Sequence, residues 1–191
     1  VSGGSRAIEL GLITLQNTRK LGVILIILAL GIAGVILSSI NTFNLNGAMQ
    51  MAVAGLLLGY FYTARPIRLV ARRGLGEIAI FLAFGPLLTL GTGYAIFNGD
   101  FENSIHFMNC LLMGIPLGLL TTNILLINEF PDMKSDAETG KNHLVVTFGK
   151  KASRWIYFIF LILAVGSSFY MYQEIGNKYL LIPTIFCLLF G

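Results

Sequence analysis

Long apolar runs constrain this chain more than any other feature of its sequence. A helix that crosses a bilayer needs about 20 consecutive apolar residues. Runs of this kind cover residues 21–40, 48–64, 78–97, 105–127 and 155–172, and a sixth begins near Tyr179. Only 12% of the 191 residues are charged, about half the fraction of a soluble domain. The sequence therefore predicts an all-α fold, a polytopic membrane helix bundle.

Positive charge alternates between the segments that join these runs. Twelve of the 13 Lys and Arg residues precede the first run, follow the second or follow the fourth. The positive-inside rule makes these segments cytoplasmic, and it explains the net charge of +4 without a nucleic-acid partner. We expect an integral protein of the cytoplasmic membrane of a prokaryote. The basic residues are Arg6, Arg19, Lys20, Arg65, Arg68, Arg72, Arg73, Lys134, Lys141, Lys150, Lys151 and Arg154.

The densest cluster of ionisable residues follows the fourth run. Asn128, Asp132 and Asp136 are spaced by four, so on a helix they lie along one stripe. Two carboxylates one turn apart suit Mg²⁺ that also binds a phosphate group and water. Lys141 follows, where its ammonium could meet a phosphate oxygen. Pro131 predicts a kink or a fresh helix start. A solvated helix end is the alternative interpretation.

Two sequence strings carry a family resemblance. Residues 128–149 read NEFPDMKSDAETGKNHLVVTFG, and the turn after the second run contains YTARPIRL at 62–69 and RGLGE at 73–77. These strings resemble the UbiA superfamily of intramembrane prenyltransferases, in particular the 1,4-dihydroxy-2-naphthoate polyprenyltransferases. The opening residues 2–4 and 10–13 are also similar, so the resemblance runs along the whole chain.

The resemblance implies a UbiA-like fold of nine transmembrane helices with two aspartate-rich motifs. Residues 1–191 would form a single, partial transmembrane prenyltransferase domain with about six of the nine helices. The first two helices, with the first motif, and the last helix would lie outside this sequence.

The resemblance also implies a Mg²⁺-dependent enzyme that moves a polyprenyl group from its diphosphate to an aromatic acceptor. The acceptor would be 1,4-dihydroxy-2-naphthoate, in menaquinone biosynthesis. Tyr60 and Phe61 are candidates for an aromatic wall around the allylic cation. The implied metal ligands and catalytic residues are Asp132, Asp136 and Asn128, and the implied diphosphate ligands are Lys141, Arg68, Arg73 and Tyr62.

Several alternatives stay open from the sequence. The acceptor could be 4-hydroxybenzoate, homogentisate, a haem ring or a glycerol phosphate. An ion-coupled transporter would place acidic residues at the bilayer midplane in discontinuous helices, and a non-catalytic scaffold needs no carboxylate stripe. His143 is either a base for the acceptor or a solvated loop residue. Glu77 either orients Arg73 or stabilises a helix start. Cys110 and Cys187 lie inside apolar runs and predict neither a disulfide nor a metal site.

Overall fold

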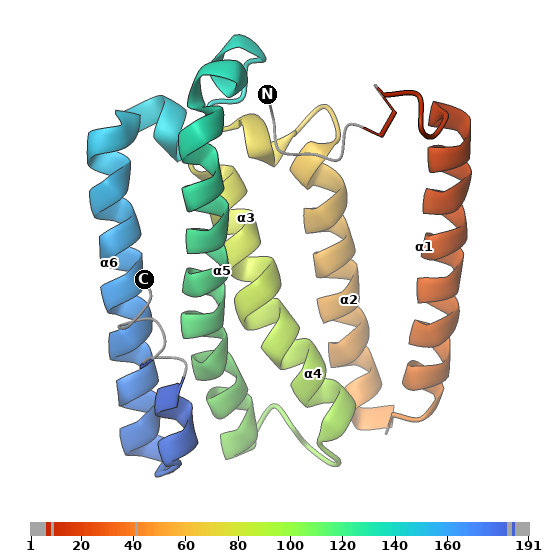
Figure 1. Cartoon of the computed structure of the whole chain (residues 1–191). Coiled ribbons are helices and arrows are strands. Elements are labelled where there is room, and N and C mark those ends of the chain that lie inside the picture. Colours follow the sequence, from red (N-terminus) through yellow and green to blue (C-terminus); the bar gives the residue numbers. More distant parts are fainter. Residues whose placement is uncertain (1–6, 9, 41, 183–184, 186–191) are drawn as a thin grey trace.

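The computed structural model describes residues 7–8, 10–40, 42–182 and 185, and every regular element in these residues is helical (Figure 1). The predicted all-α class is confirmed. In chain order the elements are α1 (Leu15–Ser38), α2 (Thr42–Thr63), η1 (Leu69–Ala71), α3 (Leu75–Leu82), η2 (Ala83–Leu87), α4 (Leu88–Ile96), α5 (Ile105–Glu138), α6 (Leu144–Ile175) and η3 (Lys178–Leu181).

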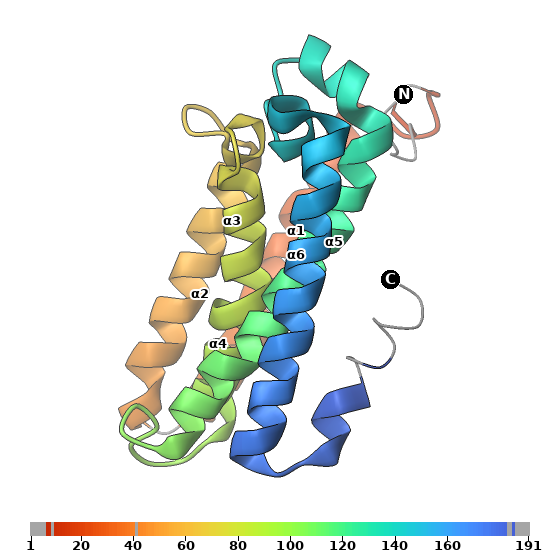
Figure 2. The same cartoon turned by 90° about the vertical axis from the view of Figure 1, so that its left-hand side faces the viewer.

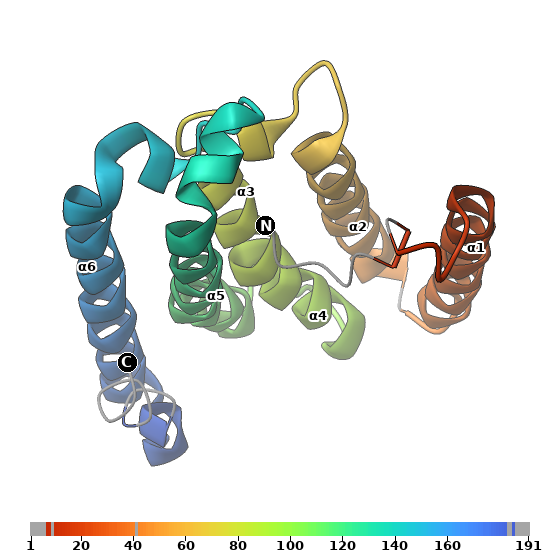
Figure 3. The ribbon, with the colours of Figure 1, turned by 45° about the horizontal axis from the view of Figure 1, so that its top comes forward.

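The long helices stand side by side in a row, and the chain reverses direction at each turn (Figure 1). Figure 3 shows that this row, from α6 through α5, α3–α4 and α2 to α1, bends into an open arc. α5 is central because it contacts α3, η2, α4 and α6, whereas α2 packs on α4. α1 stands at one end and has no buried residue. Figure 2 shows the α2–α3 turn and the α5–α6 turn at the same end of the bundle, which we call the motif end.

The exposed surface of the helices is apolar, as a lipid-facing surface must be. Leu25, Ile26, Ile27 and Leu28 of α1 are each more than half exposed, a patch that a water-soluble monomer would not leave uncovered. Among the described residues, four helical segments are long and apolar enough to cross a membrane: α1, α3–α4 (Leu75–Ile96), α5 and α6. The chain is therefore an integral membrane protein.

α2 covers the predicted run 48–64 but is not one of those four segments. Its first half carries Asn44, Asn46 and Gln50, which lower its hydropathy. Asn44 is buried, and its side-chain amide donates to the Phe97 carbonyl at the end of α4. A polar side chain in this helix therefore joins it to its neighbour.

The other runs form helices whose ends differ from the prediction. α5 begins at Ile105 as expected but continues to Glu138, eleven residues beyond the apolar run. It passes through Pro131, so the fresh helix start considered for that residue does not occur. Pro131 is exposed, and the carbonyl group that loses its helical partner there can be hydrated. Most of the sixth run lies outside the described residues.

The third run forms a broken helix instead of one straight span. A five-residue π-helical turn, η2, separates α3 from α4, and Gly85 in it has φ −102° and ψ −108°. Pro86 also removes a backbone donor. A Cβ atom on Gly114 of α5 would lie 2.7 Å from the Pro86 nitrogen, and one on Gly118 would lie 2.6 Å from the Phe81 carbonyl oxygen. Small residues let membrane helices approach closely, so these two glycines allow α5 to pack directly against the backbone of the broken helix.

Candidate functional site

The α2–α3 turn has a compact backbone that positions its arginines. Arg68 adopts φ 45° at the start of η1, and Gly74, with φ 75°, leads into α3. The Arg72 guanidinium is used within the turn, because its Nε donates to the Ile67 carbonyl at 2.5 Å. Arg68 is half-buried and Arg73 is exposed. No ion pair engages either of them in the described part of the chain, so both guanidinium groups remain available to an anion.

The α5–α6 turn is closed by a glycine in the left-handed region. Gly140 has φ 72°, and the Lys141 N–H donates to the Asp136 carbonyl at 2.9 Å. This turn then meets the α2–α3 turn, because the Asn142 N–H donates to the Ala71 carbonyl at 3.2 Å. The two turns that carry the family resemblance are therefore in direct contact.

Side chains cap the start of α6. The Leu144 N–H donates to Oε1 of Glu77 at 2.7 Å, and the Val146 N–H donates to Nδ1 of His143 at 3.4 Å. The Glu129 carboxyl group also interacts with the backbone of Val145, between them. A helix start leaves these donors without partners inside the helix and favours negative charge. Because Glu77 belongs to α3 and Glu129 to α5, the start of α6 is seated on two other helices.

Exposure changes steadily along the predicted carboxylate stripe. Asn128 is exposed, Asp132 is half-buried, and Asp136 is only 7% exposed. Each step of four residues rotates a side chain by about 40° around an α-helix, so the stripe turns from the surface into the bundle. Glu129 is also 7% exposed. It precedes Asp136 by seven residues, a rotation of only about 20°, so these two carboxylates share the buried face.

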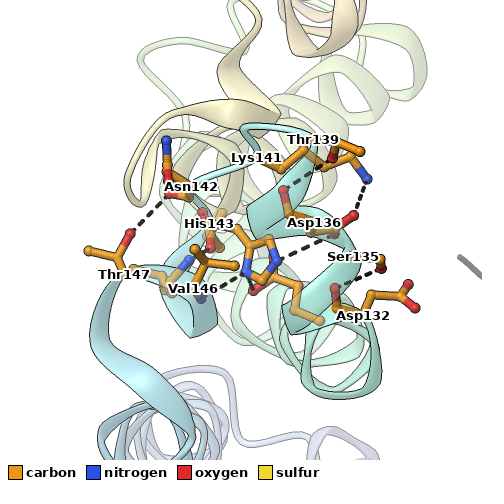
Figure 4. A network of polar contacts seen from close by, with 12 residues as sticks. Asp132, Ser135, Asp136, Thr139, Lys141, Asn142, His143, Val146 and Thr147 are labelled. Atoms are coloured by element: carbon orange, nitrogen blue, oxygen red, sulfur yellow. Dashed lines mark hydrogen bonds and ion pairs between the residues drawn. The ribbon is translucent and has the colours of Figure 1, made fainter. Parts of the chain in front are cut away.

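Asp136 is held by two neighbours (Figure 4). Its Oδ1 lies 2.9 Å from Nζ of Lys141, and its Oδ2 lies 3.4 Å from Nε2 of His143. In contrast, the Asp132 carboxylate points away from His143 and has no hydrogen-bond or ion-pair partner among the described residues. The two aspartates therefore differ in how open they are to a ligand.

His143 is buried. It is 3% exposed, and burial lowers the pKa of His143; Lys141 also lowers this pKa, whereas Asp136 and Glu77 raise it. Its Nδ1 accepts from the Val146 N–H at 3.4 Å and lies 3.1 Å from Oε2 of Glu129. Its Nε2 lies 3.4 Å from Oδ2 of Asp136. Neither Nε2 nor Oε2 of Glu129 has a hydrogen-bond partner among the described residues, so the ring lies between two carboxylates.

The predicted aromatic residues lie at the motif end of α2. Tyr62 is half-buried, and its hydroxyl interacts electrostatically with Glu129 and Glu77. Tyr60 is exposed and packs edge-to-face on Phe61, with ring centroids 5.2 Å apart. Tyr62 therefore lies close to the buried carboxylates.

Sequence reasoning missed Glu129 and the burial of His143. Glu77, Glu129, Asp136, Lys141 and His143 form one group, which we call the buried polar cluster. The seven-residue spacing of Glu129 and Asp136 was the available signal, because it marks a common helix face more closely than a spacing of four. The helix-start role considered for Glu77 is what the structure shows, although the helix that it caps is α6.

The donor set at the motif end fits a cation only in part. Within the described ranges, no group of three or more His, Cys, Asp and Glu residues is arranged to hold a metal ion. Asp132 and Asp136 nevertheless offer carboxylates one turn apart, and that of Asp132 has no partner within the described ranges. Mg²⁺ is commonly bound by one or two carboxylates with waters and substrate phosphates. These residues therefore fit a magnesium ion whose remaining ligands are supplied by a phosphate and water.

Comparison with known proteins identifies relatives of this chain. It is 31% identical over 167 residues to the 1,4-dihydroxy-2-naphthoate octaprenyltransferase of Haemophilus influenzae, which covers 85% of this chain and 51% of that protein. It is 29% identical over 156 residues to the Escherichia coli protein of the same name, covering 80% and 48%. It is 30% identical over 144 residues to the chloroplastic 2-carboxy-1,4-naphthoquinone phytyltransferase of Arabidopsis thaliana, covering 74% and 37%.

The chain thus spans about half or less of the length of these relatives. No solved structure gives a significant match. The model of the UbiA prenyltransferase family matches residues 4–191, which is nearly the whole chain. The bundle of apolar helices and the two contacting turns agree with that match. The chain belongs to the UbiA prenyltransferase family.

Proposed function

We propose that the complete protein transfers a polyprenyl group from its diphosphate to 1,4-dihydroxy-2-naphthoate in menaquinone biosynthesis. The family match and the names of the relatives support an aromatic prenyltransferase. The observation that carries the proposal is the contact between the two turns. It joins the turn that follows α5, the helix of Asp132 and Asp136, to the turn that carries Arg68 and Arg73, at the motif end.

Asp132 and Asp136 would hold magnesium, with Asn128 as a further ligand or as an orienting group. When bound, the metal neutralises charge on the departing diphosphate. Asp132 is the more accessible of the two carboxylates, whereas Asp136 is buried beside Lys141 and His143. Nε2 of His143 lies 3.4 Å from Oδ2 of Asp136, so the buried ring limits how that carboxylate can turn.

The diphosphate would be held by Lys141, Arg68, Arg73 and Tyr62. Arg68 and Arg73 have no ion-pair partner among the described residues, and guanidinium groups suit phosphate oxygens because of their forked donors. The polyprenyl tail would lie along the apolar helix faces, with Tyr60 and Phe61 near the reacting carbon. The positive-inside rule makes the motif end cytoplasmic.

An ion-coupled transporter is less well supported. It would carry acidic residues at a helix break near the bilayer midplane. The helix break here is η2 (Ala83–Leu87), and the sequence from Ile78 to Gly99 contains no charged residue. The described acidic residues lie instead near helix ends and in turns.

Asp132→Asn in the complete protein tests the proposal. We expect transfer of a labelled prenyl group to fall by more than about 100-fold, because an electrostatic contribution of several kcal/mol depends on the metal ligand. Asp100→Asn, at the opposite end of the bundle, is the matched control and should retain full turnover. Activity of the Asp132 variant within about twofold of the unaltered protein would refute the metal role. Feeding 1,4-dihydroxy-2-naphthoate, 4-hydroxybenzoate or homogentisate in parallel identifies the acceptor.

A further inference from the structure

Asp136 already has a cation at one of its carboxylate oxygens. Nζ of Lys141 lies 2.9 Å from Oδ1, and the two side chains are 31% and 11% exposed. The contact is therefore sheltered from solvent, where a charge-assisted hydrogen bond is worth more than on the surface. The same oxygen would have to be available if Asp136 is to bind a metal ion through Oδ1.

Lys141 is the basic side chain that contacts Asp136, at 2.9 Å. His143 lies at the other oxygen, Oδ2, at 3.4 Å. The other ionisable groups of the buried polar cluster, Glu77 and Glu129, are acidic. No arginine forms an ion pair with Asp136 in the described part of the chain. Lys141 therefore occupies the place at Asp136 that a bound metal ion would take.

We infer that Lys141 is an exchangeable counter-ion of Asp136. In this structure its ammonium contacts Oδ1. Asp136 would help to hold a metal ion that arrives with a diphosphate, and the Lys141 ammonium would then move to a diphosphate oxygen. Asp132, which has no such partner among the described residues, would be open from the start. This inference rests on the proposed function, and it adds that metal and diphosphate bind with positive coupling because each assists the departure of Lys141 from Asp136.

The structure allows this exchange with little backbone movement. The Lys141 backbone is held by its own hydrogen bond to the Asp136 carbonyl, next to the left-handed Gly140. Only the flexible four-carbon side chain has to swing, and lysine carries its charge as a compact group with three donors. His143 remains at Oδ2 and keeps the carboxylate oriented while Oδ1 changes partner.

Lys141→Met in the complete protein tests the exchange, since methionine keeps most of the length of the side chain and removes the charge. The probe is Mn²⁺, followed by electron paramagnetic resonance with and without inorganic pyrophosphate. A hydrogen bond to a charged group contributes about 1.5–3 kcal/mol. We therefore expect Mn²⁺ alone to bind about tenfold more tightly to Lys141→Met. With pyrophosphate, Mn²⁺ should bind about tenfold more weakly than to the unaltered protein.

The two expected changes in Mn²⁺ affinity have opposite signs, tighter without pyrophosphate and weaker with it. This pair of results distinguishes the exchange from a simpler role of Lys141. Lys134→Met, at an exposed position of α5, the helix that carries Asp136, should change neither affinity. If Lys141→Met weakens Mn²⁺ binding in the absence of pyrophosphate, or leaves it unchanged, the exchange is wrong and Lys141 is at most a diphosphate ligand. A misfolded variant would weaken both affinities, and its melting curve would reveal it.

Two further variants keep the test decisive. In an Asp136→Asn background there is no carboxylate for Lys141 to hold, so adding Lys141→Met should leave the affinity for Mn²⁺ alone unchanged. A tenfold gain there would also overturn the inference. Asp132→Asn should abolish Mn²⁺ binding with either residue at position 141. If Mn²⁺ still binds, the proposed metal site fails, which is a different result from failure of the exchange.

Discussion

Replacing Glu77 tests whether the motif end depends on side chains that cap α6. Glu77 is 3% exposed, and its Oε1 accepts the Leu144 N–H at 2.7 Å. Glu77→Ala removes this acceptor and leaves a buried backbone donor without a partner. Glu77→Gln keeps an oxygen acceptor. It also adds an amide donor that can serve Oε2 of Glu129, which is buried without a hydrogen-bond partner.

The expected cost follows from these contacts. Loss of a charge-assisted hydrogen bond contributes about 1.5–3 kcal/mol, and the one deleted methylene group contributes about 0.8 kcal/mol. Relief of the repulsion between Glu77 and Glu129 offsets part of this loss. We therefore expect Glu77→Ala to lower the free energy of unfolding by about 2 kcal/mol and Glu77→Gln to change it by less than about 1 kcal/mol.

Equilibrium unfolding of the complete protein in mixed detergent micelles, followed by tyrosine and tryptophan fluorescence, measures both values. Glu138→Ala, at an exposed position at the end of α5, is the control for loss of a carboxylate without loss of a cap. If Glu77→Ala and Glu77→Gln are equally stable, the acceptor oxygen is not what holds α6 in place. The capping argument would then be refuted.

Two further outcomes follow from the structure. Gly114→Ala should destabilise the protein by about 1–3 kcal/mol, because its Cβ would lie 2.7 Å from the Pro86 nitrogen. Gly166→Ala, whose Cβ meets no atom within 4 Å, should be neutral or stabilising by up to about 1 kcal/mol. Equal melting temperatures for the two variants would contradict this difference. The pKa of His143 is lowered by burial, so its stabilisation is present above the usual histidine pKa and is lost as the pH falls below it. His143→Asn keeps a capping oxygen and should lose less stability between about pH 7.5 and about pH 5.5; parallel pH profiles would exclude this role.

The helical fold was predictable because apolar run length carries most of the information. The runs located α1, α3–α4, α5 and α6, but they could not locate the end of α5. Residues 128–138 are polar, so hydropathy does not register them, although their backbone is helical. The break at Gly85–Pro86 was missed because the run 78–97 is apolar throughout. A Gly-Pro pair inside an apolar run was the available signal.

The candidate site was predictable in its residues and less so in its geometry. The spacing of Asn128, Asp132 and Asp136 suggested a common direction, but the rotation accumulated over eight residues is about 80°. Their exposures therefore differ, and whether they share one metal ion stays a prediction. The acceptors of the α6 N–H groups come from three separate segments. Which distant carboxylate reaches a helix start depends on tertiary packing, and local sequence does not encode it.

Gly149 separates the motif end from the membrane-crossing part of α6. Its backbone angles, φ 78° and ψ 163°, interrupt the helix after its first five residues. A straight helix would pass any shift of the motif end directly into the membrane-crossing part of α6. Here the first five residues of α6 are joined to α3 by the Leu144–Glu77 hydrogen bond, and the change of backbone direction at Gly149 separates them from the longer part of the helix. Under the proposed function, the motif end would adjust to a diphosphate without displacing that longer part.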